Sequence, residues 1–314
     1  MVEKGIVIKS TGSWYTVRTE DDRIIECKIR GKFRTKGIKT TNPLAVGDQV
    51  EFMLDESTNQ GVIGKRYDRK NYIIRKSINL SKQAHILAAN VDQAILMVTL
   101  AYPKTYPEFI DRLLVSAEAY RIPALIVFNK IDLYSDDQLN ELAILKSVYE
   151  KIGYQCIEVS AKQKIGIDII ADILANKISV IAGHSGIGKS TLINAIQPGL
   201  KLKTTEISEM HEAGKHTTTF PEMHYLNNGG YLIDTPGVKG FGVIDMDKEE
   251  IMHFFPEMFA LLPECQYNNC IHTHEPKCAV KQAVEKGEIS ASRYKSYLSI
   301  LNSEEDEKHR TVDY

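Results

Sequence analysis

The sequence lacks any long hydrophobic run. No apolar stretch in its 314 residues approaches the roughly 18 uninterrupted apolar residues that a transmembrane helix requires. The N-terminal segment carries charges within its apolar stretch and has no signal-peptide core. Low-complexity tracts and internal repeats are also absent, and an apolar fraction of 43% argues against a disordered or fibrous chain. We therefore expect a cytoplasmic protein of two or three folded domains, without membrane attachment.

Cysteine is also scarce. The chain has 5 cysteines, an odd number and too few for a secreted disulfide scaffold. Three of them cluster in one short segment, as Cys265, Cys270 and Cys278. Together with a histidine, three thiolates would close a tetrahedral structural zinc site and leave no open catalytic position. His272 and His274 are both available as the fourth ligand.

Charge is unevenly distributed, although the net charge is only -2. Residues 1–75 carry 15 Lys and Arg against 10 Asp and Glu, a net charge of +5, so the remainder carries 24 against 31, or -7. This excess of positive charge predicts an anionic partner for the N-terminal part. Short β-type stretches at 5–10, 14–19, 24–30 and 48–54, separated by turns, predict a small all-β barrel over residues 1–75. The stretch 45–52 looks like the turn and strand of OB-fold RNA-binding domains.

A basic segment lies within this barrel. Residues 28–39 hold six bases and no acid, and period-two spacing would place five of the bases on one face of a strand. Gly31 and Gly37 would instead favour a flexible loop. In either form the segment predicts an RNA-backbone contact, with an aromatic ring available for stacking. The candidate residues are Lys28, Arg30, Lys32, Phe33, Arg34, Lys36 and Lys39.

From about residue 90 the pattern changes to buried strands alternating with helices. Apolar runs at 94–100, 124–129, 156–160, 177–183 and 230–234 predict strands, and helix-period positions predict helices over Glu108–Tyr120 and Asp136–Ile152. This alternation predicts an α/β domain with a parallel sheet over residues 76–242. The residues that follow, 243–314, read as mainly helical around the cysteine cluster and form the third predicted domain.

One segment matches a complete phosphate-binding loop, Gly-x4-Gly-Lys-Ser. It follows a predicted strand and opens a predicted helix at 191–196, which is the context that this motif requires. Backbone N–H groups of such a loop cradle phosphates, Lys189 would reach the β- and γ-phosphates, and the Ser190 hydroxyl would bind Mg²⁺. The segment comprises Gly183, His184, Ser185, Gly186, Ile187, Gly188, Lys189, Ser190 and Thr191.

Two further motifs predict the nucleotide base. Asn129, Lys130, Ile131 and Asp132 follow a predicted strand and look like the guanine-specificity motif of GTPases. The Asp132 carboxylate can accept from the ring N–H and the exocyclic amine of guanine together, a pairing that adenine cannot satisfy. Some thirty residues later, Ser160, Ala161 and Lys162 resemble the supporting guanine loop, in which the Ala161 N–H contacts the base oxygen.

The remaining switch elements lie after the phosphate-binding loop. Asp234, in a DTPG sequence at a strand end, is placed to orient Mg²⁺ through water, and the Gly237 N–H to sense the γ-phosphate. A polar segment before it offers Thr217 or Thr218 as a further Mg²⁺ ligand. In an ordinary GTPase the phosphate loop comes first and the guanine motifs last. Here the guanine motifs come first, so the motif order is circularly permuted.

The assembled pattern resembles the ribosome small-subunit-dependent GTPase A family, RsgA or YjeQ, over essentially the whole chain. Segments that look like the family include 89–93, 110–112, 214–218 and 275–278, with Lys277 where a glycine is common. The resemblance implies an OB-like barrel, a permuted GTPase and a C-terminal zinc domain, with His272 favoured as the fourth zinc ligand. It also implies one structural Zn²⁺, and Mg²⁺ bound with GTP.

The resemblance further implies a monomeric GTPase that is stimulated by the small (30S) ribosomal subunit. It would bind 16S rRNA and act late in subunit maturation as a checkpoint that releases assembly factors. Because Val238 follows Gly237 where many GTPases have a water-orienting glutamine, intrinsic hydrolysis should be slow, and His216 becomes the candidate to orient water. Two alternatives stay open: a nucleotide-gated RNA-binding module, and a signalling or transport GTPase. The lack of a lipid motif weighs against the latter.

Overall fold

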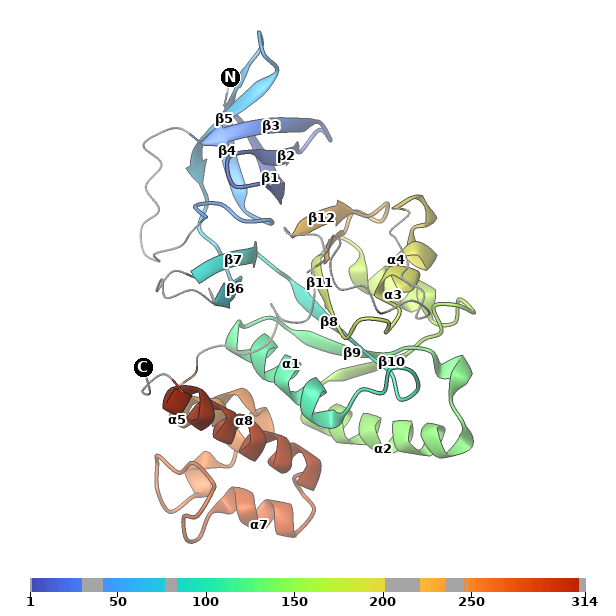
Figure 1. Ribbon diagram of the computed structural model, residues 1–314, viewed down its shortest axis with the longest axis vertical. Helices are drawn as coiled ribbons and strands as arrows, with labels where there is room; N and C mark the ends of the chain where they lie inside the picture. The colour runs from blue at the N-terminus through green and yellow to red at the C-terminus, as the bar shows by residue number, and fades with distance from the viewer. Residues whose placement is uncertain are drawn as a thin grey trace.

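A computed structural model describes residues 2–29, 42–76, 84–200, 221–234, 246 and 248–310. Three parts succeed one another along the chain: a β-barrel, a central α/β sheet domain and a C-terminal group of helices (Figure 1). The predicted fold class is confirmed. The predicted domain boundary at residue 75 falls within the strand Tyr72–Lys76, and the one at 242 lies outside the described residues.

The barrel consists of β1 (Val2–Ser10), β2 (Tyr15–Thr19), β3 (Ile24–Ile29), β4 (Gln49–Asp55) and β5 (Gln60–Arg66). The strands pair in the order β1-β2-β3-β5-β4, and β4 pairs back with β1, which closes the barrel. Alternate side chains such as Val7, Val17 and Phe52 fill its interior, as the period of two dictates. The sequence predicted four of these strands; β5 was missed because Gly61 and Gly64 interrupt its apolar pattern.

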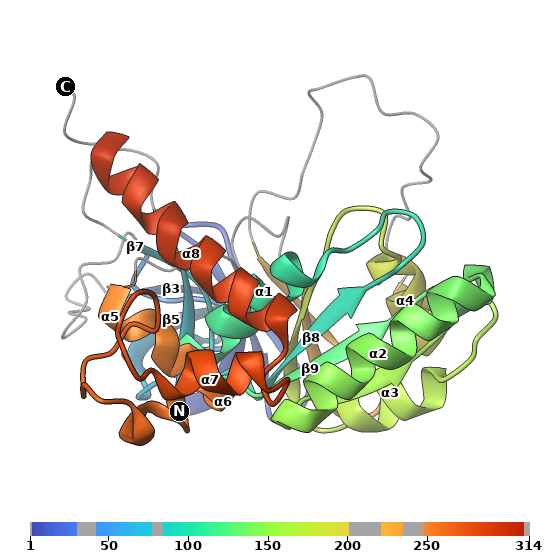
Figure 2. The same cartoon turned by 90° about the horizontal axis from the view of Figure 1, so that it is seen from below.

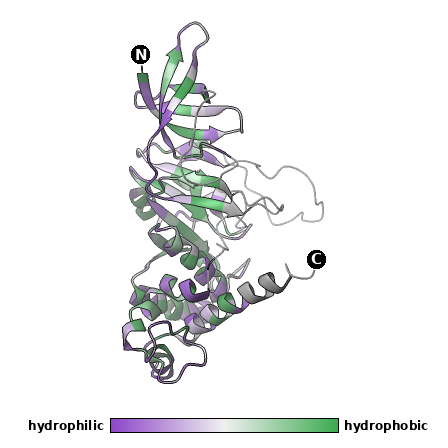
Figure 3. Cartoon of the chain, turned by 90° about the vertical axis from the view of Figure 1, so that its left-hand side faces the viewer, coloured by the Kyte–Doolittle hydropathy of each residue, from purple (hydrophilic) through white to green (hydrophobic). Residues whose placement is uncertain are grey.

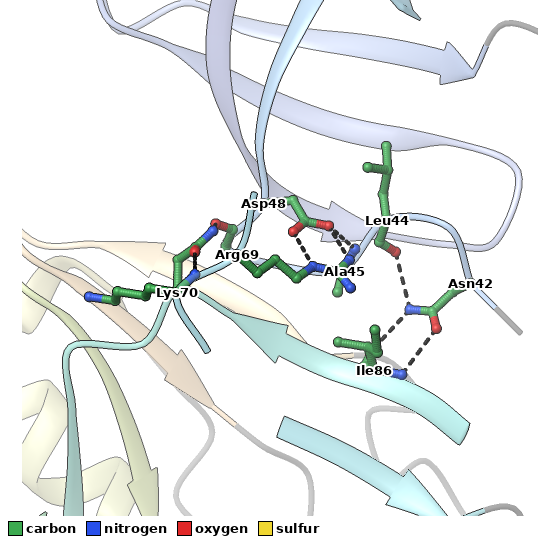
Figure 4. Close-up of polar contacts among 9 residues, drawn as sticks. Asn42, Leu44, Ala45, Asp48, Arg69, Lys70 and Ile86 are labelled. Carbon is green, nitrogen blue, oxygen red and sulfur yellow. Dashed lines mark hydrogen bonds and ion pairs between the residues drawn. The ribbon is translucent and has the colours of Figure 1, made fainter. Parts of the chain in front are cut away.

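A short hairpin of β6 (Tyr72–Lys76) and β7 (Ala84–Ala89) leads from the barrel to the central domain. The turn before β4 packs closely against the end of β7. Gly47 has a φ of 90°, and a Cβ there would lie 2.0 Å from the Ala89 carbonyl oxygen, so this contact requires glycine. Asn42 reaches across to β7, donating to Ile86 O (2.8 Å) and accepting from Ile86 N (3.0 Å) (Figure 4).

The central sheet runs in the order β10-β9-β8-β11-β13-β12, and its first five strands are parallel. The order of β8, β11 and β13 brings chain segments far apart in sequence side by side. Only β12 is antiparallel, paired with β13. The strands are β8 (Gln93–Val98), β9 (Ala124–Phe128), β10 (Gln155–Glu158), β11 (Ile178–Ala182), β12 (Glu222–Tyr225) and β13 (Tyr231–Asp234).

Helices cover both faces of this sheet. On β8, Ala94, Leu96 and Val98 face one apolar cluster while Ile95 and Met97 face another, so the strand is buried on both sides. The first cluster includes α1 (Pro107–Ala119) and α2 (Asp136–Ile152), and the second includes α3 (Ile167–Leu174) and α4 (Lys189–Ile196). Figure 3 shows the resulting hydrophobic stretches along the central strands. The sequence predicted α1, α2 and α4.

The C-terminal part is helical, as predicted, and α8 packs along α1 of the central domain (Figure 2). Its apolar core includes Phe255, Met258 and Tyr297. Its helices are α5 (Lys248–Ile251), α6 (Pro256–Phe259), α7 (Ala279–Glu285) and α8 (Ala291–Arg310). Short 3-10 helices lie here at Met252–Phe254 and Leu262–Glu264, and in the central domain at Ile131–Leu133 and Pro198–Leu200. No helix in the described ranges is long and apolar enough to cross a membrane.

Candidate functional site

The phosphate-binding loop connects the end of β11 to the start of α4. Its glycines take positive φ values, 102° at Gly188, and a Cβ at Gly188 would lie 2.4 Å from Asn129 Nδ2. The loop therefore closes onto the guanine motif only because this position has no side chain. The Lys189 ammonium donates to the carbonyl oxygens of Gly183 (2.7 Å) and His184 (2.8 Å). Its positive charge is thus held over the concave side of the loop, where phosphate oxygens would lie.

His184, inside this loop, stacks on Phe109 of α1. The ring centroids lie 3.6 Å apart with an interplanar angle of 22°. Burial and the nearby Lys189 ammonium lower the pKa of His184, so its imidazole is held neutral at physiological pH. The stack ties the first turn of the phosphate-binding loop to the N-terminal end of α1.

Asn129 follows β9 and lies between the phosphate-binding loop and the Ser160–Lys162 segment. Its side chain donates from Nδ2 to Ile187 O (2.9 Å) and accepts at Oδ1 from Ala161 N (3.1 Å). The side chain is fully buried, at 1% exposure. One amide group therefore fixes the spacing between the two segments that the sequence assigned to phosphate and to base.

Lys130 has a left-handed backbone, with a φ of 64°. Its ammonium donates to Gly186 O (2.8 Å) and to Tyr102 O in the turn after β8. Burial lowers the pKa of Lys130. The extended stem of this side chain spans from the guanine motif to the phosphate-binding loop, as expected for a lysine that lies along a purine ring.

Asp132 and Ser160 bring the ends of β9 and β10 together. The Ser160 hydroxyl donates to Asp132 Oδ1 (2.5 Å) and accepts from Gln163 N (3.1 Å). Ser160 is fully buried while Asp132 is partly exposed. The hydroxyl thereby orients a carboxylate that stays accessible to a ligand.

Part of the predicted site lies outside the described residues: His216, Thr217, Thr218 and Gly237. Asp234 ends β13 and is in register with Ile181 of β11, two residues before Gly183. Its backbone thus lies level with the start of the phosphate-binding loop. Ser190 is in the first turn of α4, and hydroxyl and carboxylate oxygens of this kind suit a hard cation such as Mg²⁺.

The predicted metal ligands come together in the C-terminal part. The donor atoms of Cys265, Cys270, His272 and Cys278 all lie within 4.8 Å of one another. His272 Nδ1 lies 3.7 Å from Cys265 Sγ and 3.3 Å from Cys278 Sγ. Bonds of about 2.3 Å to sulfur and 2.0–2.1 Å to nitrogen in a tetrahedron require edges close to these distances. The four residues therefore fit a zinc ion.

The surroundings of the cluster favour metal binding by His272. Two tyrosines hold its segment: the partly buried Tyr294 donates to His272 O (2.6 Å), and the buried Tyr297 donates to Ile271 O (2.5 Å). Burial lowers the pKa of His272, which keeps the imidazole neutral, and raises the pKa of Cys270 to about 12, so a cation is needed to stabilise its thiolate. His274 is exposed and lies outside the cluster.

Of the predicted RNA-binding residues, the structure describes only Lys28, near the end of β3; residues 30–41 lie outside the described ranges. Its ammonium lies 4.0 Å from the ring centroid of Trp14. Sequence reasoning missed Trp14, because its residue type alone could not show that the β1–β2 turn comes beside β3. It also missed Tyr102 and Tyr134, which contact the guanine motif through main-chain and hydroxyl groups.

A phosphate-binding loop and a guanine motif on one edge of a parallel sheet, with the guanine motif first in the chain, define a circularly permuted P-loop GTPase. The comparisons with known proteins agree. A family model described as RsgA GTPase matches residues 66–244, and one described as RsgA N-terminal domain matches residues 4–63. The chain belongs to the RsgA GTPase family, and it is a GTP hydrolase.

Relatives match over nearly the full length. The small ribosomal subunit biogenesis GTPase RsgA 2 of Bacteroides thetaiotaomicron is 58% identical over 309 residues, covering 98% of this chain and 99% of the relative. The RsgA of Christiangramia forsetii is 56% identical, covering 96% and 97%. The crystal structure of YjeQ from Thermotoga maritima superposes with a TM-score of 0.80 at 38% identity, covering 96% and 98%. YloQ, described as a circularly permuted GTPase, gives 0.77 at 30%, covering 98% and 96%.

Proposed function

We propose that this GTPase binds the small ribosomal subunit and hydrolyses GTP in response to it, late in the maturation of that subunit. The observation that carries the proposal is the single site formed by Asn129, which joins the phosphate-binding loop to the guanine segments. The partner is inferred from the relatives, which are named as small ribosomal subunit biogenesis GTPases. In this role the protein would act in the cytoplasm as a monomer, and hydrolysis would release assembly factors.

In the proposed site, Gly183–Thr191 binds the phosphates and Lys189 exchanges its two carbonyl partners for β- and γ-phosphate oxygens. Asp132 pairs with the guanine ring, while the Ala161 N–H, which donates to Asn129 Oδ1 in the structure, would be shared with the base oxygen. Mg²⁺ bound with GTP would be held by Ser190, by Thr217 or Thr218, and through water by Asp234. The ion would neutralise charge on the phosphates.

The two parts that flank the central domain are consistent with the small ribosomal subunit as the partner. The four residues of the C-terminal cluster would hold one structural zinc ion, which would keep α7 and α8 folded around it. The basic segment that begins at Lys28 contacts 16S rRNA, and the Trp14 ring beside Lys28 adds a surface on which a base can stack. Binding of the subunit to either flanking part would then alter the central domain.

His216 is the proposed water-orienting residue, because Val238 cannot polarise water. Replacing His216 with alanine should abolish subunit-stimulated turnover while sparing nucleotide affinity. Stimulated turnover equal to that of the wild type would remove His216 from the mechanism.

The proposal is tested by GTP turnover of the purified protein alone, with small subunits and with large subunits. We expect strong stimulation by small subunits only. Equal turnover in all three conditions would contradict the ribosome-linked role while leaving a guanine-nucleotide hydrolase. Comparing the binding of small subunits in the presence of GDP and a GTP analogue then measures whether nucleotide gates the contact.

A further inference from the structure

Tyr134 lies directly after the guanine motif, with its hydroxyl at the meeting point of two strand ends. The hydroxyl donates to Asn129 O (2.8 Å), at the end of β9, and accepts from Leu100 N (2.9 Å), after β8. Thr99 Oγ1 lies 3.3 Å away. Burial raises the pKa of Tyr134, so the hydroxyl keeps its proton as a donor.

The first consequence of this contact concerns Asn129. Its main-chain carbonyl is held by Tyr134, and its side chain joins Ile187 O to Ala161 N. Because the residue is fully buried, a shift of its main chain would move the amide away from both partners together. Tyr134 therefore fixes the residue that sets the spacing of the site.

The second consequence concerns Lys130. Leu100 is held on both sides, by Tyr134 at its N–H and by Gln138 Nε2 at its carbonyl (2.9 Å). Two residues later, Tyr102 O accepts from the Lys130 ammonium. The hydroxyl of Tyr134 thus also anchors the turn that holds the lysine expected to lie along the base.

We propose that Tyr134 is a positioning residue that sets both the affinity and the guanine selectivity of the nucleotide site without touching the nucleotide. This inference rests on the proposed assignment of Asn129, Lys130 and Asp132 to the base. Tyr134 holds the segment that carries these three residues in two ways: directly at Asn129 O, and through the Leu100–Tyr102 turn at Lys130. Asp132 lies two residues before Tyr134 in the same segment. No signal in the sequence singled out this tyrosine.

The test is Tyr134→Phe, which removes one oxygen atom and leaves two buried main-chain groups without their partner. We expect the Kd for GDP to rise about tenfold. Inosine diphosphate lacks the amine that Asp132 would read, so its Kd should rise less, about threefold, and the preference for GDP should fall. Turnover at saturating GTP should stay within about twofold, because no group that would contact phosphate is changed.

Tyr154→Phe is the matched control. This tyrosine donates to Glu118 (2.9 Å) in the same domain, away from the nucleotide site, and its loss should leave both Kd values unchanged. Wild-type GDP affinity in Tyr134→Phe, an equal loss for GDP and inosine diphosphate, or the same losses in Tyr154→Phe would each overturn the proposal. If wild type itself binds no guanine nucleotide, the proposed function fails instead.

A second variant tests the same turn without changing Tyr134, although it also removes the side-chain bond of Gln138 to Ser135 N at the start of α2. Gln138→Ala releases Leu100 from its other side and should weaken GDP binding in the same direction, by about threefold. If Tyr134→Phe does not fold, unchanged GDP affinity in Gln138→Ala would overturn the proposal.

Discussion

The central domain contacts its two neighbours through different kinds of side chain. We call the contact between the barrel and β12 the barrel joint, and the contact between α8 and α1 the C-terminal joint. The barrel has buried contacts with the β6–β7 hairpin and the segment just before it, among them the ion pair of Asp48 with Arg69. It meets β12 through one residue pair, Lys9 with Glu222, whose side chains form a half-exposed ion pair at 3.5 Å. Beside it, the Arg18 guanidinium lies 3.4 Å from the centroid of the Tyr225 ring. The two proposed switch segments contain Thr217 and Asp234, and the hairpin of β12 and β13 lies between them in the chain. The barrel joint therefore contacts an element that adjoins both segments.

The C-terminal joint is instead built on buried charge. Arg293 of α8 is 1% exposed and pairs with Asp111 of α1 (2.8 Å) and with Glu257 of α6 (2.7 Å). Tyr149 of α2 also donates to Asp111 (2.9 Å). A buried pair of this kind tolerates loss of one partner poorly, whereas exposed pairs contribute little. The C-terminal joint therefore depends on buried charge, whereas the contact of the barrel with β12 depends on partly exposed groups.

Among the changes that separate the two joints, removal of the proposed zinc ion should have the largest effect on the C-terminal joint. Zinc binding contributes on the order of 10 kcal/mol to small domains of this type, so chelation should unfold the C-terminal helices and with them the Arg293 joint. We expect loss of helical circular dichroism and rapid proteolysis after residue 246, with the barrel joint intact. Zinc added back should restore both signals. Unchanged helix content in protein proven free of metal would contradict the structural role.

Arg293→Met breaks the C-terminal joint without touching the metal. It leaves the buried Asp111 carboxylate and the partly buried Glu257 carboxylate without their cation. The free energy of unfolding should fall by about 3–5 kcal/mol, measured by denaturant titration. Adding Asp111→Leu to this variant should recover part of the loss, since no charge then remains at that position. A loss below about 1 kcal/mol would mean that the joint behaves like an exposed ion pair.

Arg18→Ala should have the smallest effect on stability, about 1 kcal/mol, as expected for a partly exposed cation–π contact. Because Tyr225 belongs to the hairpin between the switches, we also expect a change of about twofold in GDP affinity, measured by fluorescent-nucleotide titration. Arg23→Ala is the control: among the residues that the structure describes, Arg23 pairs with Glu3 and Asp21 of the barrel, and its loss should leave GDP affinity unchanged. An equal change of GDP affinity in the two variants would contradict a link between the barrel joint and the nucleotide site.

Sequence motifs indicated the candidate sites before the fold was known, but they did not indicate the joints. The phosphate-binding loop and the guanine motif each occupy a few consecutive residues, so each can be recognised as a candidate before the fold is known. The same holds for the four clustered metal ligands. By contrast, Arg293 and Asp111 are separated by 182 positions, and Arg18 and Tyr225 belong to different domains. Nothing in their residue types shows that they meet. Tyr134 was missed for a different reason, because its contacts are to main-chain atoms, which carry no sequence pattern.

The central claim is that the guanine motif and the phosphate-binding loop form one guanine-nucleotide site, although the guanine motif comes first in the chain. Exchange of Asp132 for asparagine tests it most directly. An asparagine amide can donate to the 2-oxo group of xanthine but no longer accepts from both N–H groups of guanine, so Asp132→Asn should bind GDP on the order of 100-fold more weakly. The same variant should gain affinity for xanthosine diphosphate in parallel titrations. Unchanged GDP affinity, with no gain for xanthosine diphosphate, would contradict the account.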